Sequence, residues 1–222
     1  EEAQIPLEKI HHVFVSHKHT DHVLGLVWVI RGIGQLIHEG QYEGNLTIYC
    51  HEELVHTIRA ITDATLDKPI ADLIGERILL RVVGDGEKEF LAGYEVDFFD
   101  IHSIKAKQFG FRTRLSSGKN LTFIGDEPYN PLCRNYVENS EWLLSEAFCL
   151  YSERDIFKPY EKHHSTVKEV CELAEELKIK NLVLWHTEDR NLAQRKKLYS
   201  HEGKNYFKGN LYVPDDLEVM QL

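Results

Sequence analysis

Residues 16–22 read Ser-His-Lys-His-Thr-Asp-His and place three imidazoles and one carboxylate within six positions. They directly follow Val13–Val15, an apolar triplet that predicts a short buried strand. The first two imidazoles are two positions apart, so an extended chain points both the same way. Nitrogen and oxygen ligands at this density suit zinc or a similar divalent ion, and the stretch therefore predicts a metal site. Its candidate ligands are His17, His19, Asp21 and His22.

One short loop cannot easily complete two coordination shells, so further ligands are expected elsewhere in the chain. Three ligand-type residues come just after predicted strands, where sites in layered α/β folds often collect. A lone His after a strand is more often a surface or hydrogen-bonded core residue, but the dense cluster favours the metal interpretation here. The three residues are His102 after 95–101, Asp126 after 121–124 and His186 after 182–185.

Apolar runs and chain breakers predict strands and helices that alternate at both ends of the chain, with a β meander over 94–124 between them. This order predicts an α/β sandwich with helices outside packed sheets. The sequence contains no repeat or linker, so residues 1–222 are expected to form a single domain. Strands are expected over 13–15, 46–50, 77–83, 94–101, 109–115, 121–124, 142–148 and 182–185, and helices over 21–38, 52–64, 167–177 and near 190–200.

Composition narrows the function classes. The net charge of -10 over 222 residues argues against a general nucleic-acid coat, although it leaves room for a local basic patch. The longest apolar run, Val23–Ile30, has eight residues and is too short to span a membrane. Four Cys without CxxC spacing fit reduced thiols in a cytoplasmic protein better than a disulfide framework.

The pattern His-x-His-x-Asp-His, followed by Gly-Asp and a final His, resembles that of the metallo-β-lactamase-fold hydrolases. The resemblance implies a four-layer αβ/βα sandwich and two divalent ions, zinc or alternatively manganese. Only 16 residues precede His17. Since the family fold begins with a β-hairpin, either the start is trimmed or the first sheet lacks its N-terminal strands. In the implied ligand sets, His17, His19 and His102 hold one ion, Asp21, His22 and His186 hold the second, and Asp126 bridges them.

The second half of the chain is similar to ribonuclease Z and related phosphodiesterases. His-Ser-Thr at 164–166, Ser-Glu-Ala-Phe at 145–148 and Gln-Phe-Gly-Phe-Arg at 108–112 carry this likeness. It implies that Glu146 orients His164, which donates a proton to the leaving oxygen, while a metal-bridging hydroxide attacks. Alternatively, the histidine is an exposed residue at a helix start and the glutamate a structural carboxylate. The catalytic set is accordingly Asp21, Glu146 and His164.

The chain also departs from that family. Glu127 stands where a Thr is usual, Ser145 replaces a His, and only 23 residues separate His102 from Asp126. No long Gly- and Lys-rich arm that would grip tRNA fits in this interval. Phosphodiester cleavage is therefore expected, with a tRNA precursor as one candidate substrate and a homodimer as the expected assembly. The alternatives are hydrolysis of a small cyclic phosphodiester, a lactone or a thioester, and a non-catalytic metal-binding interaction protein.

Local charge bears on the substrate. Residues 101–125 contain five Lys or Arg and no acid, and a second basic set lies within 190–197. Both could face an anionic substrate, or both could be ordinary solvated surface.

Overall fold

The computed structural model describes residues 4–222, and its strands form two sheets. The first sheet is parallel and contains β1 (His12–Phe14), β2 (Leu46–Cys50) and β3 (Ile78–Val82) in that order. The second sheet contains β4 (Lys88–Leu91), β5 (Tyr94–Asp100), β6 (Phe109–Arg114), β7 (Asn120–Phe123), β8 (Trp142–Glu146), β9 (Asn181–Trp185) and β10 (Asn210–Tyr212). Its strand order is β10-β9-β8-β7-β6-β5-β4.

Helices α1 (Thr20–His38), α2 (Glu52–Thr65) and α3 (Lys68–Ala71) connect the parallel strands of the first sheet. Parallel neighbours need such crossovers, because a tight turn cannot bring the chain back to the same end of the sheet. One face of α1 is apolar at helical spacing and packs into the core of this half. The buried side chains of that face are Val23, Leu26, Ile30 and Ile33.

The second sheet is covered by α6 (Val167–Glu176) and α7 (Arg195–Gly203), with the short helices α4 (Arg134–Val137) and α5 (Arg154–Phe157). The predicted capping box of Thr166 and Glu169 is present and fixes the start of α6. The buried stripe of α6 consists of Val167, Val170, Cys171 and Ala174. Short 3-10 turns cover Leu7–Lys9, Pro131–Cys133, Tyr151–Glu153, Tyr160–Lys162 and Leu192–Gln194.

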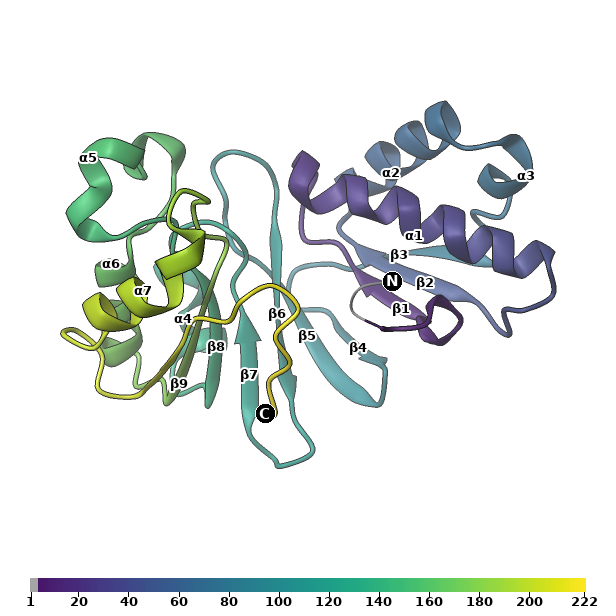
Figure 1. The fold of residues 1–222 in the computed structure, drawn as a ribbon. Coiled ribbons are helices and arrows are strands. Elements are labelled where there is room, and N and C mark those ends of the chain that lie inside the picture. The colour runs from purple at the N-terminus through teal and green to yellow at the C-terminus, as the bar shows by residue number, and fades with distance from the viewer. Residues whose placement is uncertain (1–3) are drawn as a thin grey trace.

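An aromatic layer joins the two sheets. Phe14 of β1 lies 5.1 Å from Phe98 of β5 between ring centroids, and Tyr49 of β2 stacks on the same ring at 5.9 Å. Helices therefore lie outside both sheets, on the right and left of the molecule in Figure 1, with the sheets between them. This arrangement confirms the predicted four-layer sandwich.

Two edge strands were not predicted. β4 reads Lys-Glu-Phe-Leu and exposes the Phe90 side chain, so its sequence lacks the buried alternation by which strands are recognised. β10 has only three residues and pairs with β9 at the other edge. The first sheet has three strands in the described part of the chain. Within residues 4–222, no helix is both long enough and apolar enough to cross a bilayer.

Candidate metal centre

Three neighbouring parallel strands bring candidate site residues to one edge of the second sheet. β7, β8 and β9 run in the same direction, so their carboxyl ends meet. Asp126 follows β7, Glu146 is the last residue of β8, and His186 directly follows β9. The first sheet adds the loop after β1, in which extended backbone at His19 ends directly at the first turn of α1.

The first donor group consists of His17, His19 and Asp126. His17 Nε2 lies 2.8 Å from His19 Nδ1 and 3.5 Å from Asp126 Oδ2. The predicted i, i+2 placement of the two imidazoles is therefore realised. Burial lowers the pKa of His17 to about 3, which keeps its ring neutral and its lone pair available to a metal ion.

The second donor group consists of Asp21, His22, Asp126 and His186. Asp126 Oδ2 lies 3.3 Å from His22 Nε2 and 3.6 Å from His186 Nε2. His186 Nε2 also lies 3.2 Å from Asp21 Oδ2, whose helix-start position was predicted. Asp126 belongs to both groups, which is the geometry that a bridging carboxylate requires.

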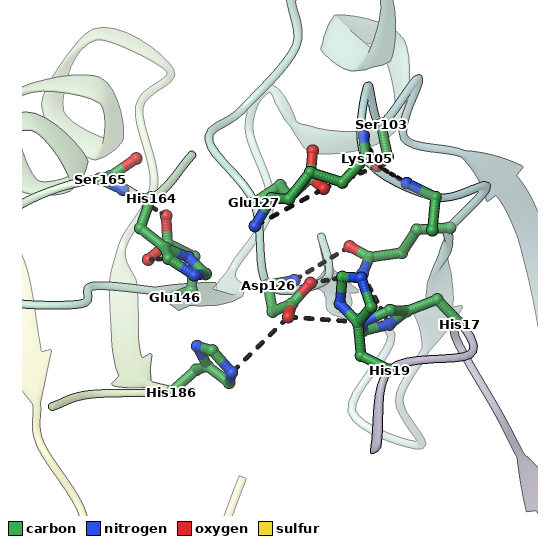
Figure 2. Close-up of polar contacts among 12 residues, drawn as sticks. His17, His19, Ser103, Lys105, Asp126, Glu127, Glu146, His164, Ser165 and His186 are labelled. Atoms are coloured by element: carbon green, nitrogen blue, oxygen red, sulfur yellow. Dashed lines mark hydrogen bonds and ion pairs between the residues drawn. The ribbon is translucent and has the colours of Figure 1, made fainter. Parts of the chain in front are cut away.

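The donor chemistry of both groups fits a divalent ion. The first group combines two imidazole nitrogens with one carboxylate oxygen, and the second combines two of each, which are ligands that zinc and manganese take in proteins. Burial disfavours the charged form of Asp126, but contacts with His22 and Gln108 outweigh it and hold the pKa of this carboxyl below its usual value. Asp126 is therefore ionised and ready to bind a cation. Figure 2 shows His17 and His19 on one side of Asp126 and His186 on the other.

The structure does not bring His102 into either group. His102 is exposed, has a φ of 58°, and its backbone N–H donates to Asp100 Oδ1 at 2.7 Å. The loop that carries it is held by Ser103, whose hydroxyl donates to the buried Glu127 at 2.7 Å (Figure 2). A ligand role for His102 stays a prediction.

Gln108 was not predicted and contacts both donor groups through Asp126. Its fully buried carboxamide donates to Asp126 Oδ1, and its Oε1 accepts from the Asp126 N–H at 3.1 Å. Its Nε2 also lies 2.7 Å from His17 Nδ1. Gly125 makes room for this side chain, because a Cβ there would overlap Gln108 Oε1. The sequence offered no signal for it beyond its place before Phe109, since a lone Gln has no ligand pattern.

Glu146 and His164 form a buried pair beside the second donor group. Glu146 Oε2 lies 3.7 Å from His164 Nδ1, and neither atom has a hydrogen-bond partner in residues 4–222. The Ser165 N–H donates to Glu146 Oε1 at 2.7 Å and fixes the carboxyl. Burial raises the pKa of Glu146. The His164 ring centroid lies 5.2 Å from the His186 ring centroid, so the pair adjoins the second donor group.

In the acid-free basic stretch, the three lysines lie beside acids, whereas Arg112 and Arg114 donate to backbone carbonyls. Its lysines meet acids from other parts of the chain, which sequence order could not reveal. In the second basic set, Arg195 is buried and approaches two acids of the C-terminal segment, while Lys196 Nζ lies 2.6 Å from Glu218. The ion pairs of the first stretch are Lys105–Glu127 at 4.0 Å, Lys107–Glu52 at 3.1 Å and Lys119–Glu141 at 2.9 Å.

The sequence also matches a known family. The family model described as "Beta-lactamase superfamily domain" covers residues 2–187. The chain belongs to the β-lactamase superfamily. Membership and the two donor groups together support binding of divalent metal.

Individual proteins are also similar to this chain in sequence or in structure. Ribonuclease Z of Macrococcus caseolyticus is 24% identical over 237 residues, which cover 85% of this chain and 74% of the relative. The metallo-β-lactamase fold protein YhfI of Bacillus subtilis superposes with a TM-score of 0.74 at 18% identity, over 98% of this chain and 80% of that one. The short form of human tRNase Z gives 0.69 at 19% identity, over 99% and 82%. These structural likenesses show the metallo-β-lactamase fold.

Proposed function

We propose that this chain is a dinuclear metal-dependent phosphodiesterase of the ribonuclease Z type. The observation that carries the proposal is the Asp126 carboxylate shared by two donor groups, with the Glu146–His164 pair beside them. Relatives named Ribonuclease Z support the reaction class. A lactonase or thioesterase would need the same ions, but no observation favours either.

The ligands divide between two ions. His17, His19 and Asp126 would hold one, and Asp126 with Asp21, His22 and His186 would hold the other. Bound ions of this kind activate water for attack at neutral pH and neutralise charge on the phosphate. Asp21 is largely exposed, so water and a substrate can reach its carboxylate. This placement supports the catalytic role predicted for Asp21 in addition to its ligand role.

The residues of the buried pair have separate tasks. Glu146, held by the Ser165 N–H, faces His164 Nδ1 and would keep the ring oriented. The other side of the His164 ring would then donate a proton to the leaving oxygen. A histidine suits this step because imidazole both accepts and donates protons near neutral pH. The carboxylate would also stabilise the charged ring before it gives up the proton.

The substrate is the finer part of the proposal. We place a tRNA precursor first, because the relatives are ribonuclease Z enzymes, and small phosphodiesters second, because no long arm lies between β5 and Asp126. The test uses protein loaded with zinc or with manganese, with both ions verified by elemental analysis. A 3′-extended tRNA precursor and bis(p-nitrophenyl) phosphate are supplied separately.

Specific cleavage after the discriminator base would support tRNA 3′ processing. Turnover of the small diester alone would keep the phosphodiesterase and remove the tRNA substrate. Failure on both substrates, with both ions in place, would reject the proposed function. Faster turnover of a lactone or a thioester would then support that alternative.

A further inference from the structure

A cavity of about 300 Å³ lies beside His164, and no candidate metal ligand lines it. Its walls come from the loop that follows Asp126, from β8, and from α6 with the turn before it. It therefore adjoins the proposed proton donor outside the two donor groups. Among its lining residues are Tyr129, Tyr160, His164, Glu169, Val170 and Leu173.

The apolar part of the lining suits a flat ring. Tyr129 and Tyr160 supply aromatic surface, and Val170 and Leu173 of α6 supply aliphatic surface. Aromatic side chains stack on nucleobases whatever the base, because every base has a π face. The volume is at the lower end of the range for small-molecule pockets and suits one ring system.

The polar part of the lining includes side chains that are held in place. Tyr129 Oη is buried and has no hydrogen-bond partner in the described residues. Glu169 is different: Oε2 caps α6, and Oε1 accepts from Tyr160 Oη at 2.7 Å. Tyr160 is therefore held in place as one wall.

We propose that this cavity is the leaving-group subsite and that it binds the nucleobase on the leaving side of the cleaved bond. The inference rests on the proposed function, in which His164 protonates the leaving oxygen. The group bonded to that oxygen must lie beside His164, and the cavity is a space there that can hold it. The proposed metal ligands lie on the other side of His164, since the His186 ring is 5.2 Å from the His164 ring.

The test measures binding of adenosine to the metal-loaded protein by calorimetry and by saturation-transfer NMR, with ribose as the ligand that lacks a base. Leu173→Trp fills the cavity and is expected to raise the Kd of adenosine at least tenfold. Tyr160→Ala removes a half-exposed wall without disturbing the core and should weaken binding several-fold. Tyr160→Phe keeps the ring and should bind close to the unaltered protein. Leu132→Trp is the matched control, because Leu132 is 70% exposed and lies outside the cavity.

The outcomes separate this inference from the proposed function. Adenosine binding that is weakened by Leu173→Trp and Tyr160→Ala, but not by Leu132→Trp, supports the subsite. Equal binding in all variants, or equal binding of ribose, overturns it even if phosphodiesters are cleaved. If the metal-loaded protein cleaves no phosphodiester, yet adenosine binding depends on Tyr160, the nucleobase site stands and the leaving-group role falls with the proposed function.

Discussion

His102 and His186 both follow a strand, but only His186 belongs to a donor group. Each comes within two residues of the end of a strand, and each has a left-handed backbone, with φ of 58° and 51°. His186 joins the second donor group, whereas His102 is exposed and lies outside both groups. A strand end therefore selects the edge of the sheet but does not decide where the side chain points.

The chain segments that follow β9 and β5 explain why the two histidines lie in different places. β9 has parallel neighbours on both sides, so the chain after it leaves the sheet over the edge where β7 and β8 also end. β5 is followed by its antiparallel neighbour β6, so the chain must turn back through the loop 101–108. Glu127 holds this returning loop through Ser103, and the residue that re-enters the sheet beside His17 is Gln108.

The largest effect is expected at Asp126, which contacts both His186 and Gln108, the residue at the end of the loop that carries His102. Asp126→Ala removes the oxygen shared by both donor groups, so bound metal and hydrolysis should be lost together. The rate should fall on the order of 10³-fold or more, since such ions contribute several kcal/mol to the transition state. Elemental analysis and turnover of bis(p-nitrophenyl) phosphate measure the two losses. A variant that kept both ions would show that the bridging assignment is wrong.

The next effect concerns the pair beside His186. His164→Ala should keep the ions, because this ring belongs to neither donor group, but should lower kcat on the order of 10²-fold or more. His163→Ala is the matched control, because His163 lies next to His164 in the sequence but has no assigned role. Metal content, kcat and the pH profile are measured for both variants. Retained turnover in His164→Ala would remove the proton-donor assignment.

A smaller effect is expected at Gln108, the last residue of the loop 101–108 between β5 and β6. Gln108→Ala removes contacts to His17 and Asp126 without removing a ligand. Loss of such an outer partner typically costs about 10- to 100-fold in metal affinity. Competition with a chromogenic chelator measures this loss. Unchanged affinity would show that Gln108 only fills space.

The sequence predicted the fold and pointed to most residues of the two donor groups, because these signals are local. The imidazole spacing of 16–22 needed only a strand followed by a helix, and the structure contains both. Asp126 and His186 were proposed because each follows a strand, and parallel strands carry such residues to a common edge, whereas Glu146 was proposed from the resemblance to ribonuclease Z. Gln108 could not be found this way, because its contacts cross 91 residues to His17 and depend on how one loop turns back. The acids that neutralise the basic stretch were missed for the same reason.

The smallest effect is expected at His102, and it tests whether His102 and His186 differ in their contribution to metal binding. In the structure His102 does not reach the donor groups, so His102→Ala should leave metal affinity and turnover within about twofold of the unaltered protein, as for an ordinary surface substitution. The family resemblance implies the opposite, because there the same residue is a ligand and its loss should empty the first group. The chelator competition used for Gln108 distinguishes the two.

A second variant sharpens this result by releasing the loop. Glu127→Thr removes the acceptor that holds Ser103 and the acid that approaches Lys105 at 4.0 Å. If this carboxylate keeps His102 away from the ions, then adding His102→Ala to Glu127→Thr should lower metal affinity, although His102→Ala alone does not. Equal affinity of the single and double variants would show that the antiparallel return, rather than Glu127, sets the position of His102. A loss of metal in His102→Ala alone would mean that His102 is a ligand in solution and that the two strand ends are equivalent after all.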